Sequence, residues 1–92
     1  MTKAYSLQDL ELFLRVAESG NMSEVARQLN ITNAAVSAAI KRLELALDVN
    51  LLERTTRSLH LSAAGQSLIP YLQQALGALD DAESELRNLQ TA

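Results

Sequence analysis

Apolar residues recur every three or four positions along the first part of the chain, which is the spacing of an amphipathic helix. The first such stretch begins after Ser6, which can cap a helix together with Asp9. It ends at Gly20, a residue that readily adopts the left-handed conformation at a helix C-terminus. Its apolar positions are Leu7, Leu10, Phe13, Leu14 and Ala17. We therefore predict a helix between Ser6 and Gly20 that buries this face.

Two more short helices are predicted close behind the first. Ser23 can cap a helix that carries Val25, Ala26 and Leu29 inward, and Asn30 tolerates the positive φ that ends a helix. Thr32 can cap a further helix that runs to Leu47. The apolar residues of this helix are Val36, Ile40, Leu43 and Leu47. Two helices joined by so short a turn form a helix-turn-helix, with the second helix placed to enter the major groove of DNA.

The period of the pattern changes after Asp48, where two brief strands are predicted. Leu51, Leu52 and Arg54 precede a polar Thr-Thr-Arg-Ser segment, and Leu59, His60 and Leu61 follow it. Short apolar runs on either side of a polar turn are typical of a β-hairpin. A hairpin after a helix-turn-helix is a wing, so the pattern predicts a winged helix-turn-helix.

A long helix is predicted from Ser62 to about Leu89. Its apolar positions alternate at +4 and +3 over three heptads: Leu68, Leu72, Ala75, Leu79, Ala82, Leu86 and Leu89. So long a seam cannot be buried against so small a domain, and its burial against a second copy is favoured at about 25 cal/mol per Å². We therefore expect a homodimer formed through this helix.

The expected fold is mostly α-helical and has two parts. Residues 1–61 form a winged helix-turn-helix head with three helices and a two-stranded wing, and residues 62–92 form a linker and dimerisation helix. Double-stranded DNA is the expected partner. The net charge of -3 conceals an uneven distribution, because residues 62–92 carry four acids and one Arg, whereas the first 61 residues carry seven basic and seven acidic side chains. Phosphate attraction depends on local charge within a Debye length, so the acidic helix matters less than the total suggests.

Several other classes of protein are excluded by composition and motif. The 92 residues include no Cys and a single His, so neither a metal centre nor a redox cofactor is expected. We find no nucleophile with a His and an acid at suitable spacing and no Gly-rich phosphate loop, so the chain is not expected to be an enzyme. No apolar run is long enough for a membrane span or a signal peptide, so we expect a soluble, cytoplasmic protein.

Four motifs together resemble one family. They are the F-x-x-V-A of Phe13 to Ala17, the A-x-S-x-x-I-x-x-L-E of Ala35 to Glu44, the Leu-Glu-Arg-Thr of residues 52–55, and the Ser-x-x-Gly of Ser62 and Gly65. In these residues the chain resembles the N-terminal region of LysR-type transcriptional regulators of bacteria. The resemblance implies a DNA-reading head and a linker helix that pairs antiparallel with its counterpart. It also implies that an effector-binding domain is absent from this chain, and that RNA polymerase is a possible partner of the full-length protein.

The residues expected to contact DNA lie on the outer face of the third helix, at the starts of the second and third helices, and in the wing. They are Ser23, Thr32, Asn33, Ala34, Ser37, Ala38, Lys41, Arg42, Arg54 and Arg57. Many relatives carry Gln at position 33 and a long cation at position 38, so sparse base contacts are expected from Asn33, Ala34 and Ala38.

Structural roles compete with DNA contact at several of these positions. Ser23 and Thr32 can cap their helices as well as meet phosphates, and Lys41 and Arg42 can be solvated surface charges. Arg54 can pair with Glu53 or Glu44, whereas Arg57 has no obvious local partner. Glu44 and Gly65 are interpreted as structural residues. A winged helix that binds another protein instead of DNA is the alternative function, because the head is near neutral.

Overall fold

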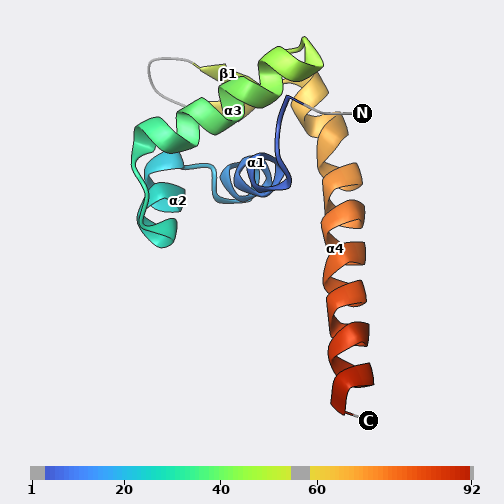
Figure 1. The fold of residues 1–92 in the computed structure, drawn as a ribbon. Coiled ribbons are helices and arrows are strands. Elements are labelled where there is room, and N and C mark those ends of the chain that lie inside the picture. The colour runs from blue at the N-terminus through green and yellow to red at the C-terminus, as the bar shows by residue number, and fades with distance from the viewer. Residues whose placement is uncertain (1–3, 55–58, 92) are drawn as a thin grey trace.

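The structure is a computed structural model that describes residues 4–54 and 59–91. Its elements follow in the order α1 (Leu7–Ser19), α2 (Met22–Leu29), α3 (Asn33–Leu47), β1 (Leu52–Arg54), β2 (Leu59–Leu61) and α4 (Ala63–Thr91) (Figure 1). The two strands pair antiparallel, with Leu52 opposite Leu61 and Arg54 opposite Leu59. The predicted winged helix-turn-helix with a long C-terminal helix is confirmed.

Capping residues mark the helix ends largely as predicted. Ser6 and Asp9 form a capping box, in which the Asp9 N–H donates to Ser6 Oγ at 3.1 Å and the Ser6 N–H donates to Asp9 Oδ2 at 3.2 Å. Gly20 and Asn30 end α1 and α2 in the left-handed region, with φ of 73° and 58°. Thr32 caps α3 as predicted, because its side chain accepts from the Ala35 N–H at 3.0 Å.

The prediction that Ser23 caps α2 is wrong. Asn21 is the cap, and its side-chain oxygen accepts from the Glu24 N–H at 3.1 Å. Asn and Ser are about equally good capping residues, and the apolar pattern did not decide between two positions so close together. Ser23 lies instead in the first turn of α2, where its side chain is exposed.

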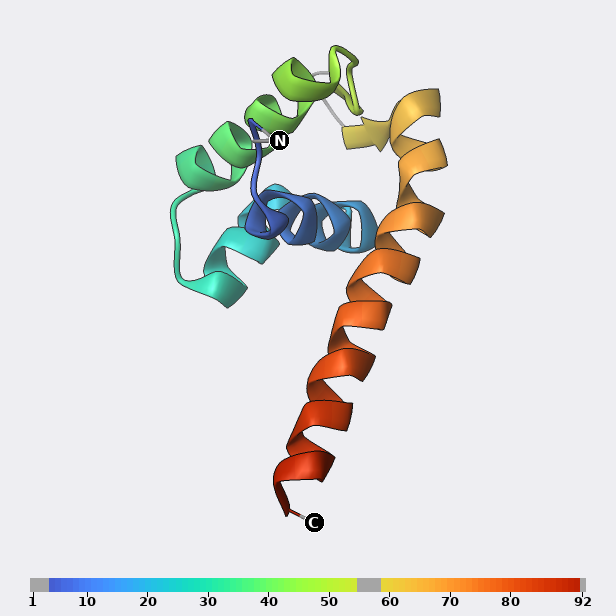
Figure 2. The ribbon, with the colours of Figure 1, turned by 45° about the vertical axis from the view of Figure 1, so that its right-hand side comes forward.

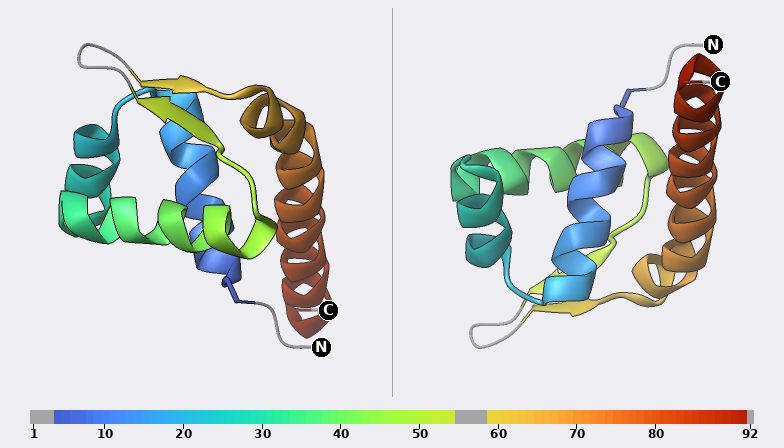
Figure 3. Two further views of the ribbon diagram at one scale, coloured as in Figure 1. Left: turned by 90° about the horizontal axis from the view of Figure 1, so that it is seen from above. Right: turned by 90° about the horizontal axis from the view of Figure 1, so that it is seen from below.

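One core holds the head together, with α1 in contact with α2, α3 and α4 (Figure 3). Phe13, Val36 and Ile40 are fully buried in it. Each such side chain stabilises the fold by about 1.5 to 3 kcal/mol relative to exposure. On α1 the predicted face is confirmed at Phe13, which is buried, and at Leu10, Leu14 and Ala17, which are half-buried. It is wrong at Leu7, which is exposed, and it left out Leu12 and Val16, which are buried.

Helix α4 starts on the head and then leaves it. Leu72 is buried in the core, whereas Leu79, Leu86 and Leu89 are 44%, 60% and 66% exposed. Beyond the head, no other element lies beside α4 among the described residues (Figures 1 and 2). The expectation that the head cannot bury the whole seam therefore holds, although Leu72, assigned to the exposed seam, lies in the core of the head instead. None of the helices among residues 4–54 and 59–91 is apolar enough over a sufficient length to cross a membrane.

The junction between α3, β1 and α4 is closed by short polar contacts. Ser62 Oγ donates to the Asn50 carbonyl at 2.5 Å and accepts from the Gly65 N–H at 3.0 Å. The Ser62 N–H donates to the Leu51 carbonyl at 2.9 Å. A Cβ on Gly65 would lie 2.3 Å from the Leu51 carbonyl oxygen, so no larger residue fits here. The interpretation of Gly65 as a packing residue is confirmed.

We expect Gly65→Ala to destabilise the chain by about 1 to 3 kcal/mol, because the backbone of Leu51 must move to admit the methyl group. Gly77→Ala is the matched control, since nothing lies within 4 Å of its Cβ position. In that helix interior, Ala should stabilise by about 0.5 to 1 kcal/mol. Urea unfolding followed by circular dichroism measures both. Equal effects of the two substitutions would contradict the close contact at Gly65.

Candidate nucleic-acid interface

Helix α3 has one buried and one exposed face. Val36, Ala39, Ile40 and Leu43 are buried, because α3 packs against α1 and α2. The opposite face holds the residues predicted to approach DNA, of which Asn33, Ala34, Ala38 and Lys41 are exposed and Ser37 is half-buried. Figure 3 shows α3 crossing α1 on one side of the molecule, where its outer face is uncovered by the described elements. A surface of small and polar side chains allows the helix backbone to come close to a groove.

The starts of α2 and α3 lie together. Asn33 Nδ2 donates to Ser23 Oγ at 2.9 Å, across ten positions of sequence. Both residues are exposed, as is Thr32, whose hydroxyl oxygen is engaged in the α3 cap. Two helix N-termini side by side present positive dipole ends, which favour an anion such as a phosphate nearby.

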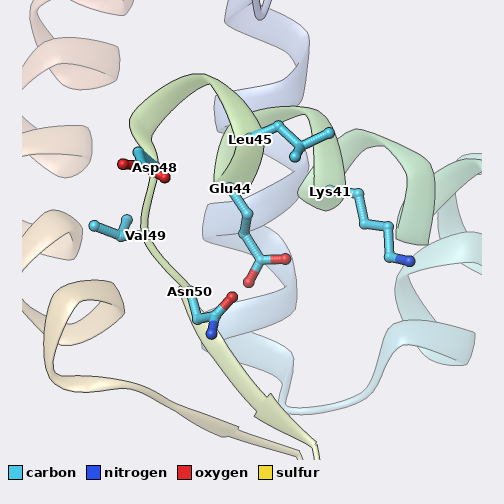
Figure 4. A pocket seen from close by; sticks show the side chains of 6 residues that line it. All are labelled: Lys41, Glu44, Leu45, Asp48, Val49 and Asn50. Atoms are coloured by element: carbon cyan, nitrogen blue, oxygen red, sulfur yellow. The ribbon is translucent and has the colours of Figure 1, made fainter.

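Lys41 and Arg42 are neighbours in sequence but differ in their surroundings. Lys41 is exposed and extends away from Asp48 and Val49 at the far end of α3 (Figure 4). Arg42 instead makes a two-pronged ion pair with α1, in which its Nε and Nη2 donate to Asp9 Oδ2 and Oδ1 at 3.1 and 2.9 Å. Sequence reasoning missed this pair, because the two residues are 33 positions apart and Asp9 was assigned only to the cap.

The ion pair determines the titration of Asp9. Its hydrogen bonds with the Arg42 guanidinium lower the pKa of the Asp9 carboxyl below its ordinary value. Burial acts in the opposite direction, and the bond from the Ser6 N–H lowers the pKa further. Asp9 is only 3% exposed, so an unpartnered charge there would be costly. Arg42 thus holds α3 on α1.

In the wing, the structure describes the two strands, β1 and β2. His60 lies on β2 opposite Glu53 and is exposed, which agrees with its interpretation as an ordinary surface residue. Arg54 is the last residue of β1. The side chain of Arg54 and all of Arg57 lie outside the described residues, so the predictions of phosphate contact there stay predictions.

A shallow hollow at the C-terminal end of α3 contains no catalytic arrangement. It is lined by Lys41, Glu44, Leu45, Asp48, Val49 and Asn50 (Figure 4). Glu44 Oε2 accepts from the backbone N–H groups of Leu51 and Leu52 at 2.8 and 3.3 Å, so its carboxylate holds β1 in place. Among residues 4–54 and 59–91 no cluster of His, Asp and Glu could hold a metal ion.

The chain is similar to known proteins in both sequence and structure. Residues 7–66 match the family model described as bacterial regulatory helix-turn-helix protein, lysR family. The chain is 44% identical over 85 residues to the probable HTH-type transcriptional regulator LtrA of Klebsiella pneumoniae, an alignment that covers 92% of this chain and 28% of that protein. The chain thus spans little more than a quarter of that relative. Such relatives are named transcriptional regulators, which agrees with the prediction that the chain is not an enzyme.

Two similar solved structures are DNA complexes. The complex of the BenM DNA-binding domain with catB site 1 DNA matches with a TM-score of 0.89 and 26% identity, over 95% of this chain and 98% of that one. The complex of the CbnR DNA-binding domain with DNA matches with a TM-score of 0.84 and 29% identity, over 92% and 98% of the two chains. In both cases the likeness takes in the head and the long helix together.

The Asp9–Arg42 pair predicts a pH dependence of stability. The pKa of Asp9 is lower in the folded chain than in the unfolded chain, so the ionised carboxylate stabilises the fold. This stabilisation is fully present above the ordinary carboxyl pKa and is lost as the pH falls through the lower pKa of the folded chain. We expect wild type to be more stable than Asp9→Asn at neutral pH, with the difference shrinking below about pH 4. Urea unfolding across this range measures it. Asp81→Asn, on the exposed part of α4, is the charge-matched control, and an equal pH dependence in both variants would contradict the assignment.

Proposed function

Since the chain belongs to the lysR family of bacterial regulatory helix-turn-helix proteins, we propose that it is the DNA-binding region of a transcriptional regulator and occupies promoter half-sites as a homodimer. The observation that carries the proposal is the exposed outer face of α3, where every side chain over the first two turns is short, either an alanine methyl group or a polar Asn or Ser. A bacterial regulator meets DNA in the cytoplasm, which is where we place it.

DNA binding is favoured over the alternative of a protein-binding winged helix. The two DNA complexes named above match nearly the whole of this chain, from the head into the long helix. The near-neutral charge of residues 1–61 is what argued for the alternative, whereas the acidic excess lies on α4, at Asp80, Asp81, Glu83 and Glu85. Those charges therefore lie away from α3 and do not set the potential at its outer face.

The proposed contacts divide into base reading and phosphate binding. Asn33, Ala34 and Ala38 face the base edges, where methyl groups can contact thymine. The phosphates of the DNA backbone are bound by Ser23, Thr32, Ser37 and Lys41 of the head, together with Arg54 and Arg57 of the wing. We leave Arg42 out of this set, because Asp9 engages two of its nitrogens. We keep residues 1–61 as the DNA-binding head and residues 62–92 as the linker, and RNA polymerase is a further proposed partner of a full-length regulator.

We propose that the dimer forms through the part of α4 that has left the head. Leu79, Leu86 and Leu89 supply exposed apolar surface there, and Ala75 and Ala82 share their face. Leu72 is buried in the core of the head and is removed from the proposed seam, whereas Leu68 is only partly buried and stays in it. The same face leads back to an apolar hollow of about 320 Å³ at the start of α4, lined in part by Val49, Leu51 and Tyr71.

The charge pattern of α4 supports antiparallel pairing. Residues 63–79 contain no charged side chain, whereas four acids and one Arg follow within residues 80–87. Parallel helices would bring the two acidic segments together, but antiparallel helices place each acidic segment beside an uncharged one. The C-terminal leucines of one copy then come near the hollow of the other. Each head lies at an opposite end of the pair, as two separate half-sites require.

Leu86→Ala should weaken the dimer at least about tenfold, because each copy loses one buried leucine. Gln73→Ala, on the opposite face of the same helix, is the control and should leave the dimer dissociation constant unchanged. Sedimentation equilibrium over a range of concentrations measures both. An unaltered constant for Leu86→Ala, or a wild-type chain that stays monomeric, would rule out this interface.

A plot of log affinity against log salt concentration has a negative slope, and Lys41→Ala should make this slope shallower by about 0.9, the effect of one lost phosphate contact. The double variant Asp9→Asn/Arg42→Ala removes the neighbouring guanidinium without leaving the buried Asp9 charge unpaired, and it should leave the slope unchanged, because that guanidinium pairs with Asp9. Fluorescence anisotropy with a duplex selected by the wild-type chain from a random pool gives both slopes. Equal slopes for the two variants would contradict the proposed division of roles. Wild-type binding that is absent or insensitive to salt would instead favour the protein-binding alternative.

A further inference from the structure

The hydrogen bond from Asn33 to Ser23 has no evident task in holding the fold. Asn21 caps α2 and Thr32 caps α3, so neither partner is needed to end its helix. The two helices are already joined by buried apolar residues, among them Val25 and Val36. Yet Asn33 Nδ2 and Ser23 Oγ meet at 2.9 Å on the exposed surface that the proposed function assigns to DNA. An exposed hydrogen bond of this kind adds little to the stability of the fold, so stability does not explain why these two side chains meet.

We propose that Ser23 is a positioning residue that orients the amide of Asn33 for base reading. The proposal rests on the DNA-binding function proposed above and names a specificity determinant within it. A serine hydroxyl has one hydrogen to donate and two lone pairs to accept with. When that hydrogen is given to a phosphate oxygen, Ser23 can only accept from Asn33. The Nδ2 of Asn33 must then face Ser23, and its Oδ1 faces away, toward the groove.

This orientation selects among bases by the groups they present in the major groove. Adenine offers the N6 amino donor and the N7 acceptor, which match Oδ1 and the second hydrogen on Nδ2 of Asn33. Guanine offers two acceptors, O6 and N7, so one of them would face Oδ1 without a hydrogen between them. An amide held by Ser23 therefore favours an A·T pair over a G·C pair at its position. An amide without that bond can rotate and discriminates less.

The experiment measures base preference separately from overall affinity. Wild-type chain selects a duplex from a random pool, and the A·T pair with the greatest effect on binding is replaced by G·C in a second duplex. The preference is the ratio of the two dissociation constants from fluorescence anisotropy. The same ratio is measured for Ser23→Ala, Ser23→Thr, Asn33→Ala and the double variant. Thermal unfolding confirms that each variant is folded.

Asn33→Ala should lower the preference by roughly 5- to 150-fold, the effect of one bidentate contact. Ser23→Ala should lower it by roughly 2- to 10-fold, the effect of one hydrogen bond. The double variant should be no worse in preference than Asn33→Ala, because Ser23 acts through that side chain. Ser23→Thr keeps the hydroxyl and should retain the preference.

The competing outcome is a Ser23 that binds phosphate and nothing more. Ser23→Ala would then weaken both duplexes equally and leave the preference intact, which overturns the inference while DNA binding stands. A wild-type chain that favours G·C where Asn33 acts, or an Asn33→Ala variant with full preference, overturns it as well. A wild-type chain that binds no duplex at all overturns the inference and the proposed function together.

Discussion

The burial of one face of α3 is the constraint on which the rest of the structure depends. Val36, Ile40 and Leu43 have no exposed surface, and they share a core with Phe13 of α1. A helix with one face fully buried has only the opposite face to offer to a ligand. The outward position of Asn33 and Lys41 is therefore a consequence of packing on the other side of the helix. The Arg42–Asp9 ion pair adds a polar clamp at the edge of the same contact.

The far end of α3 is tied to the rest of the chain through backbone atoms. The Glu44 carboxylate accepts hydrogen bonds from the N–H groups of Leu51 and Leu52, at the start of β1. The Ser62 hydroxyl donates a hydrogen bond to the carbonyl of Asn50. Gly65 brings the first turn of α4 against the Leu51 carbonyl. These contacts link α3, the wing and the long helix at one junction. A movement of α4 at that point must disturb the position of β1 as well.

Local features were predictable from the sequence, and features that need the third dimension were not. The caps at Ser6 and Thr32 and the close approach at Gly65 follow from residue type and spacing. The Arg42–Asp9 pair joins residues far apart in the chain, and each of them has an ordinary local role that conceals the contact. Leu72 fits the apolar seam of α4 perfectly well by period, but periodicity cannot tell which turns the head will cover. The contact between Asn33 and Ser23 likewise depends on how two helices meet.

The uninterrupted course of α4 through Pro70 links the two ends of the molecule. A helix of 29 residues is about 43 Å long and turns by about 100° per residue. Since its first turn is locked to the head and its last turns are proposed to pair with a second copy, the register of that pairing fixes the rotational phase between the two heads. DNA also repeats its grooves with a fixed helical period. In the proposed dimer, the number of residues between Gly65 and the paired leucines would set the number of base pairs between the two half-sites, and a change in either length would turn one head away from its groove.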